Sequence, residues 1–139
     1  MTITINAYFS FRKNARQAME FYQSVFGGEL TVGTFKEFGA AQNPDEEALV
    51  MHSQLTAPNL ITLMASDVPD RENVVFGDNV SLSLSGDDGD TLRRWFDQLA
   101  VGGHVEQPLI EASWGDTFGM CVDQFGIRWL FNISPKIEK

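Results

Sequence analysis

The stretch AMEFYQSVFGG, residues 18–28, places an aromatic pair four residues before a pair of glycines. Its apolar side chains recur at helical spacing, which predicts an amphipathic helix, and glycine commonly follows a last helical turn. The second half of the chain repeats this signature, because Trp95-Phe96 precedes Gly102-Gly103 by five residues. The repeat indicates that the chain consists of two similar units.

Alternating apolar and polar residues on both sides of each helix predict strands. The predicted strands span residues 3–11, 29–35, 49–55 and 60–65 in the first half, and 79–84, 104–106, 117–122 and 127–133 in the second. Asn14 is the predicted N-cap of the first helix, and the acids of residues 87–90 suit the start of the second. We expect residues 66–78 to link the halves and residues 108–115 to form a connector.

This order of elements predicts the α+β class, with two βαβββ modules. One helix cannot cover both faces of a four-stranded sheet, so we expect the modules to pair, with curved mixed sheets around a cavity and the helices outside. We predict one domain over residues 1–135. Its modules occupy about 1–67 and 78–135, and residues 136–139 form a charged tail.

Ten basic and nineteen acidic residues give the chain a net charge of −9 at pH 7. This charge repels nucleic-acid phosphates and anionic membranes, so we expect neither as a partner. The single cysteine, Cys121, can form no intrachain disulfide, and its apolar neighbours predict a buried thiol. The N-terminus lacks the positive region and the long apolar core of a signal peptide, which favours a soluble, cytoplasmic protein.

Several short motifs occur in the order in which one known family carries them. They are Tyr8–Phe11, residues 18–28, Met51-His52, Leu63–Asp67, Trp114–Gly119 and Asp123–Trp129. On these motifs the chain resembles the vicinal oxygen chelate superfamily of glyoxalase I, bleomycin-resistance proteins and extradiol dioxygenases, and within it the PhnB-like branch. The resemblance implies a glyoxalase-like fold and a homodimer. Some members of the branch carry a demethylubiquinone methyltransferase label, but the sequence has no glycine-rich nucleotide loop that supports this chemistry.

The metal-dependent members of the superfamily bind a divalent ion through four side chains, two from each half. Carried over to this chain, those positions fall at Ala7, Thr62, Asn79 and Leu130. Ala and Leu have no donor atoms, and Thr and Asn are weak neutral ligands where His, carboxylate or thiolate is normally required. We therefore predict no metal at this site and no cofactor.

His52 and Asp67 are the candidate catalytic residues. His52 lies in an apolar strand, where it is either a structural histidine or a pocket-lining acid, base or hydrogen-bonding group. Asp67 either caps the turn after its strand or faces the mouth of the cavity. His104, in a hydrophilic setting, is expected to be exposed.

Six residues are the candidate ligand-binding set, since aromatic rings with a few polar groups suit a small organic ligand. They are Asn79, Ser81, Thr62, Trp114, Phe118 and Arg128. Trp114 either fills the core or lines a pocket or a subunit contact. Arg128 either points outward or binds an anion in the cavity. Asn79 and Ser81 contribute only if their strand turns them inward.

Two functions follow from these residues. The first is a metal-free protein that binds or sequesters a small molecule. The alternative is an enzyme of the lyase, dioxygenase or resistance-transferase class, which uses His52, Asp67 or a metal at another position. A purely structural role with a partner protein is a third reading.

Overall fold

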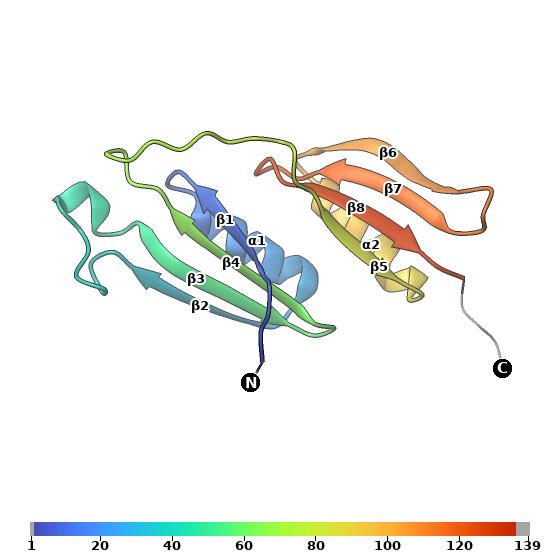
Figure 1. The fold of residues 1–139 in the computed structure, drawn as a ribbon, viewed down its shortest axis with the longest axis horizontal. Helices are drawn as coiled ribbons and strands as arrows, with labels where there is room; N and C mark the ends of the chain where they lie inside the picture. Colours follow the sequence, from blue (N-terminus) through green and yellow to red (C-terminus); the bar gives the residue numbers. More distant parts are fainter. Residues whose placement is uncertain (1, 136–139) are drawn as a thin grey trace. The chain divides into compact units, whose positions relative to one another are not determined.

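The computed structural model describes residues 2–135, so Met1 and the predicted tail at 136–139 lie outside the described residues. The chain divides into two compact units, Met1–Val75 and Phe76–Lys139 (Figure 1). Unit 1 contains β1 (Ala7–Phe11), α1 (Ala15–Phe26), β2 (Glu29–Thr34), the short 3-10 helix η1 (Pro44–Glu46), β3 (Val50–Ala57) and β4 (Ile61–Asp67). Unit 2 contains β5 (Leu82–Gly86), α2 (Gly89–Ala100), β6 (His104–Glu111), β7 (Thr117–Val122) and β8 (Arg128–Ile133). Within residues 2–135, no helix is long and apolar enough to cross a membrane.

Both units have the same sheet topology. The strand orders are β1-β4-β3-β2 in unit 1 and β5-β8-β7-β6 in unit 2. In each unit the first and last strands pair in parallel, and the remaining pairs are antiparallel. The predicted α+β fold with two βαβββ modules is therefore confirmed by the topology.

Each helix packs its apolar face on its own sheet. The buried side chains of α1 include Met19 and Tyr22, and those of α2 include Trp95 and Phe96. The ring of Phe96 meets Phe131 of β8 edge to face, with 5.3 Å between ring centroids. The repeated aromatic pairs thus anchor each helix to its sheet.

The second glycine of each repeated pair lies against the backbone of a neighbouring strand. A Cβ at Gly28 would collide with the backbone of Thr56 and Ala57 at the end of β3. A Cβ at Gly103 would collide with the backbone of Val122 and Asp123, at the equivalent end of β7. Only glycine allows this approach, which explains why the glycine pair recurs after each helix.

Two predicted strands begin several residues before the observed ones. β1 begins at Ala7 and β5 at Leu82, so residues 3–6 and 79–81 lie outside the strands. Ala7 pairs with Leu63 and Leu82 pairs with Trp129, close to the starts of β4 and β8, so the residues before them have almost no strand to pair with. Ile3 and Ile5 are accordingly 97% and 99% exposed.

β6 extends into the segment predicted as a connector and ends at Glu111, because its ladder tolerates a proline. Pro108 has no N–H, and the register of β6 against β7 shifts between Val105 and Gln107 and again between Gln107 and Ile110. These irregularities interrupt the alternating pattern that identifies a strand in the sequence.

Candidate functional site

The face of each sheet turned away from its helix carries half of the predicted site residues, namely His52, Thr62, Phe118 and Arg128. We call this the open face. In β4, Leu63, Ala65 and Asp67 are buried on the helix side, so strand alternation places Thr62 and Met64 on the open face. The same argument places Tyr8 there, between Ala7 and the buried Phe9.

Tyr8 and His52 meet on the open face of unit 1. The hydroxyl of Tyr8 lies 3.4 Å from Nδ1 of His52, and the ring centroids are 5.9 Å apart at an angle of 36°. Tyr8 is 50% exposed, and His52 is half-buried. Strands β1 and β3 lie on either side of β4, so this contact joins two predicted segments that are 44 residues apart.

Phe38 adds a third ring to this face. Gly33 of β2 pairs with His52 of β3, so the two positions point to the same side of the sheet. A Cβ at Gly33 would collide with the ring of Phe38, which is 59% exposed. We call Tyr8, His52 and Phe38 the aromatic row.

Asp67, the second catalytic candidate, lies on the helix side of the same sheet. Its two carboxylate oxygens accept hydrogen bonds from the backbone N–H groups of Ala15 (3.0 Å) and Val50 (2.9 Å). The carboxylate thus supports the start of α1, where the side chain of the predicted N-cap, Asn14, makes no capping bond. The structure does not bring Asp67 together with His52.

In unit 2, Phe118, Leu130 and Asn132 lie on the open face, because their neighbours Gly119, Phe131 and Ile133 are buried on the helix side. Phe118 pairs with Asn132 across β7 and β8. The Nδ2 of Asn132 donates to Oδ2 of Asp116 at 3.0 Å. This face also combines an aromatic ring with polar groups.

Arg128 is engaged by other groups of unit 2. Its Nε lies 2.6 Å from Oε1 of Glu106, and its Nη1 donates to the backbone carbonyl of Asp78 at 2.8 Å. The hydrogen bond from Arg128 holds the pKa of Glu106 below its usual value. The same partner raises the pKa of Arg128. A guanidinium held on two sides is poorly placed to bind a free anion.

The remaining predicted ligand-binding residues lie outside the strands. Trp114 is 69% exposed in the turn between β6 and β7, so it does not fill the core of its unit. Asn79 and Ser81 precede β5, because Leu82 is the first residue with a strand partner. The condition under which these two residues would contribute, a strand that turns them inward, is therefore not met.

Within unit 1, the two positions carried over from the metal-dependent superfamily members lie on opposite faces of the sheet. Ala7 lies on the helix side of its sheet, and Thr62 lies on the open face. Asn79 is three residues away from the start of β5. Within residues 2–135, no three His, Cys, Asp or Glu side chains gather in a group that could hold a metal ion.

A family model described as 3-demethylubiquinone-9 3-methyltransferase matches residues 3–131. The chain belongs to this family. Protein YjdN of Escherichia coli (strain K12) is 27% identical over 140 residues, which cover 93% of this chain and 94% of the relative. Protein PA1353 from Pseudomonas aeruginosa is 32% identical, and its crystal structure gives a TM-score of 0.81 with 97% of this chain and 100% of that chain covered.

Two further solved structures share the fold of the chain. A PhnB protein from Bacillus cereus is 24% identical, with a TM-score of 0.76 over 95% of this chain and 100% of that chain. A glyoxalase/bleomycin resistance/dioxygenase family enzyme from Burkholderia phytofirmans PsJN is 14% identical and shares the fold, with a TM-score of 0.60 over 91% and 96% of the two chains. The chain thus shares the fold of this superfamily, as the PhnB-like motifs predicted.

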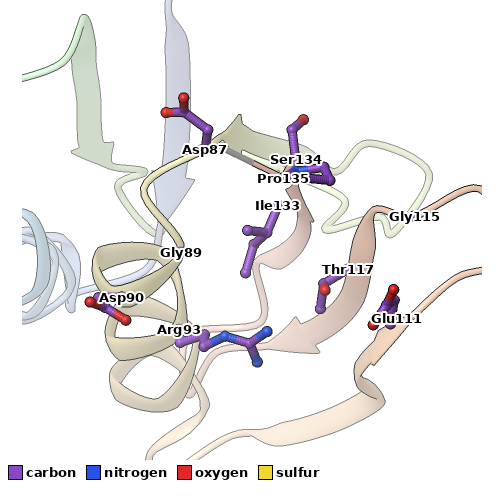
Figure 2. A pocket seen from close by; sticks show the side chains of 10 residues that line it. All are labelled: Asp87, Gly89, Asp90, Arg93, Glu111, Gly115, Thr117, Ile133, Ser134 and Pro135. Atoms are coloured by element: carbon purple, nitrogen blue, oxygen red, sulfur yellow. The ribbon is translucent and has the colours of Figure 1, made fainter. Parts of the chain in front are cut away.

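The PhnB-like chain also has a pocket of about 500 Å³ in unit 2, at the start of α2 (Figure 2). Figure 2 shows Arg93 extending from α2 toward Thr117 and Glu111. Asp87 and Asp90 also line the pocket, so its lining includes one guanidinium and three carboxylates. These mixed charges select no single ligand chemistry. None of the residues predicted for the site lines this pocket.

Sequence reasoning missed Tyr8, Phe38 and Asn132 as site residues. The alternation in residues 8–11 could have identified Tyr8, since it stands out of phase with Phe9 and Phe11. Phe38 gives no such signal, because it lies in a turn after β2 and reaches Gly33 only through the fold.

Proposed function

We propose that this PhnB-like protein binds a small organic molecule through shape, ring contacts and hydrogen bonds, without a metal ion. The ligand lies on the open face of unit 1. The observation that carries the proposal is the contact between Tyr8 and His52, two half-exposed rings with polar atoms on a face that α1 does not cover. Apolar and aromatic walls with a few placed polar groups are typical of small-molecule sites.

The residue types near the superfamily metal positions favour binding without a metal. Ala7 and Leu130 offer no donor atom, and His52 is the only imidazole in unit 1. One imidazole with neutral oxygens is a poor site for zinc or a related divalent ion. Recognition then depends on the aromatic row and on hydroxyl groups such as that of Thr62.

A fragment titration of metal-stripped protein tests the proposal. In ¹H–¹⁵N NMR spectra, aromatic fragments should shift the resonances of β1, β3 and β4 most strongly, and EDTA should not change these shifts. His52→Gln should weaken the binding. His104→Gln is the matched control, because His104 is the only other histidine and is exposed at the start of β6. Binding that requires added zinc, manganese or nickel would overturn the proposal.

The same contact favours a second candidate, acid–base catalysis by His52. In the tautomer whose Nδ1–H donates to the hydroxyl of Tyr8, the Nε2 of His52 can accept a proton from a substrate. A turnover screen with thiol hemiacetals, catechols and epoxides tests this function. Activity that is lost in His52→Gln and kept in His104→Gln would support it, and no turnover by well-folded protein would contradict it.

The assembly and location of the protein remain predictions from the sequence. We propose a homodimer in the cytoplasm, with the small molecule as the ligand and neither nucleic acid nor membrane as a partner. The net charge of −9 supports the last point. Size-exclusion chromatography with light scattering tests the dimer.

A further inference from the structure

We propose that the open face of unit 1 selects flat aromatic compounds that carry a neutral hydrogen-bond acceptor, such as a ketone or amide carbonyl. The Nε2–H group of His52 is the donor that recognises this acceptor. This inference rests on the proposed function and names the ligand class of the same site.

The contact with Tyr8 fixes which nitrogen of His52 carries the proton. Nδ1 lies 3.4 Å from the hydroxyl of Tyr8. A phenol is a better donor than a neutral imidazole N–H, and an imidazole nitrogen is a better acceptor than a phenol oxygen. The O–H of Tyr8 therefore donates to Nδ1, and the proton of the neutral ring resides on Nε2.

The Nε2 atom is available to a ligand. Within residues 2–135, the contact with Tyr8 is the one polar interaction of the His52 side chain. A half-buried donor without a protein partner is satisfied by water or by a ligand, and a ligand acceptor replaces that water without loss. His52 therefore adds a directional hydrogen-bond donor to a surface that otherwise offers mainly ring contacts.

The flanking side chains favour a flat ring over a saturated one. Tyr8 of β1 and Phe38 beyond β2 lie on either side of the position held by His52. Met64, the partner of Tyr8 on β4, adds a polarisable thioether to the same face. Aromatic contacts of this kind contribute beyond the area that they bury.

The charges near the site favour a neutral acceptor over a carboxylate. Strands β1, β3 and β4, all within the described part of the chain, contain no Lys or Arg. The chain as a whole carries a net charge of −9. An anionic ligand on these three strands would therefore meet the negative charge of the chain with no cation on the strands themselves to offset it.

Three probe compounds measure separately what the aromatic ring and the carbonyl acceptor contribute to binding. They are 2-acetylnaphthalene, which has both, 2-ethylnaphthalene, which lacks the carbonyl, and cyclohexyl methyl ketone, which lacks the aromatic ring. We would titrate each into metal-stripped protein at pH 8, where an imidazole is ordinarily neutral, and follow the ¹H–¹⁵N shifts of unit 1. The acetyl compound should bind about tenfold more tightly than 2-ethylnaphthalene, the effect of one good hydrogen bond.

Two variants and one spectrum assign the donor. His52→Phe should keep the ring binding and lose the tenfold preference, while Tyr8→Phe should reduce the preference, because Nδ1 then no longer accepts a hydrogen bond from the hydroxyl. His104→Gln should leave the preference unchanged. A long-range ¹H–¹⁵N spectrum of the histidine side chains should show the Nε2–H tautomer for His52.

The outcomes distinguish this inference from the function on which it rests. Equal binding of both naphthalenes on the open face, or an Nδ1–H tautomer, would overturn the donor role and leave metal-free binding intact. If other aromatic fragments shift the open-face resonances and 2-acetylnaphthalene does not, the ligand class alone is overturned. An absence of open-face shifts with every fragment would overturn both.

Discussion

Arg128 and Glu106 form an ion pair that spans β7, with 2.6 Å between Nε and Oε1. Because Arg128 lowers the pKa of Glu106 below the ordinary 4.5, the pair stabilises the folded chain above that pH and loses its effect as the pH falls through the folded-state pKa. We expect Glu106→Gln to reduce the fall in unfolding free energy between neutral and acidic pH. The effect should be small because both groups are partly exposed. Urea midpoints at neutral pH and below the pKa of Glu106 measure it.

The control for this variant is Glu111→Gln. Glu111 lies on the same strand, and no ion pair within residues 2–135 involves its carboxylate. Equal changes in the two variants at low pH would show that general charge, and not the pair with Arg128, sets the acid dependence.

Asp67→Ala should be among the most destabilising substitutions in unit 1. It leaves the buried N–H groups of Ala15 and Val50 without their acceptor, which we expect to cost about 2–4 kcal/mol of unfolding free energy. Asp67→Asn keeps one acceptor oxygen and should cost less. Urea unfolding measures both, and Asp87→Asn, at an exposed position, is the control. An unchanged midpoint for Asp67→Ala would contradict the anchoring role of the carboxylate.

Cys121 should react slowly in the native protein. Burial raises the pKa of its thiol to about 12, and the charges of Asp123 and Glu106 add to the effect. At pH 8 the thiolate fraction is then about a thousandfold below that of an ordinary cysteine. Reaction with a chromogenic disulfide should be minimal in buffer and rapid in concentrated guanidinium. Since the chain has one cysteine, Cys121→Ser gives the blank, and fast labelling of native protein would show that the thiol opens to solvent.

Gly28→Ala should destabilise unit 1 more than Gly27→Ala, although the two positions are adjacent. Both have positive φ, which costs a side-chain-bearing residue about 1–2 kcal/mol. A Cβ at Gly27 meets no atom within 4 Å, whereas one at Gly28 overlaps the backbone of Thr56. We expect a total loss of at least about 3 kcal/mol for Gly28→Ala, because β3 must shift. Thermal unfolding compares the two, and equal losses would show that only backbone conformation matters.

The sequence predicted the elements of the fold better than the partners of its side chains. Helices and most strands were readable, because periodicity reports which face of an element is buried. Residues 3–6 alternate as a strand does, but only the fold shows that β4 starts too late to pair with them. The β6 strand was cut short for the opposite reason, since Pro108 interrupts a ladder that continues beyond it.

The sequence identified single residues of the candidate site, but it did not show which residues contact one another. His52 stood out as a polar residue in an apolar strand, and the structure adds Tyr8 as its neighbour from the far side of β4. Asp67 belonged to the same family motif as Leu63, but strand parity turns it toward α1, where backbone amides occupy both of its oxygens. Motif membership alone does not separate a structural carboxylate from a functional one.

Gly33 determines how closely the Phe38 ring can lie to the strand position opposite His52. With hydrogen in place of a side chain, it gives the Phe38 ring room to rest on the strand, so its replacement would displace this ring and leave Tyr8 and His52 unchanged. Under the proposed function, a substitution at Gly33 would therefore change the ligand preference of the open face while His52 and Tyr8 are kept.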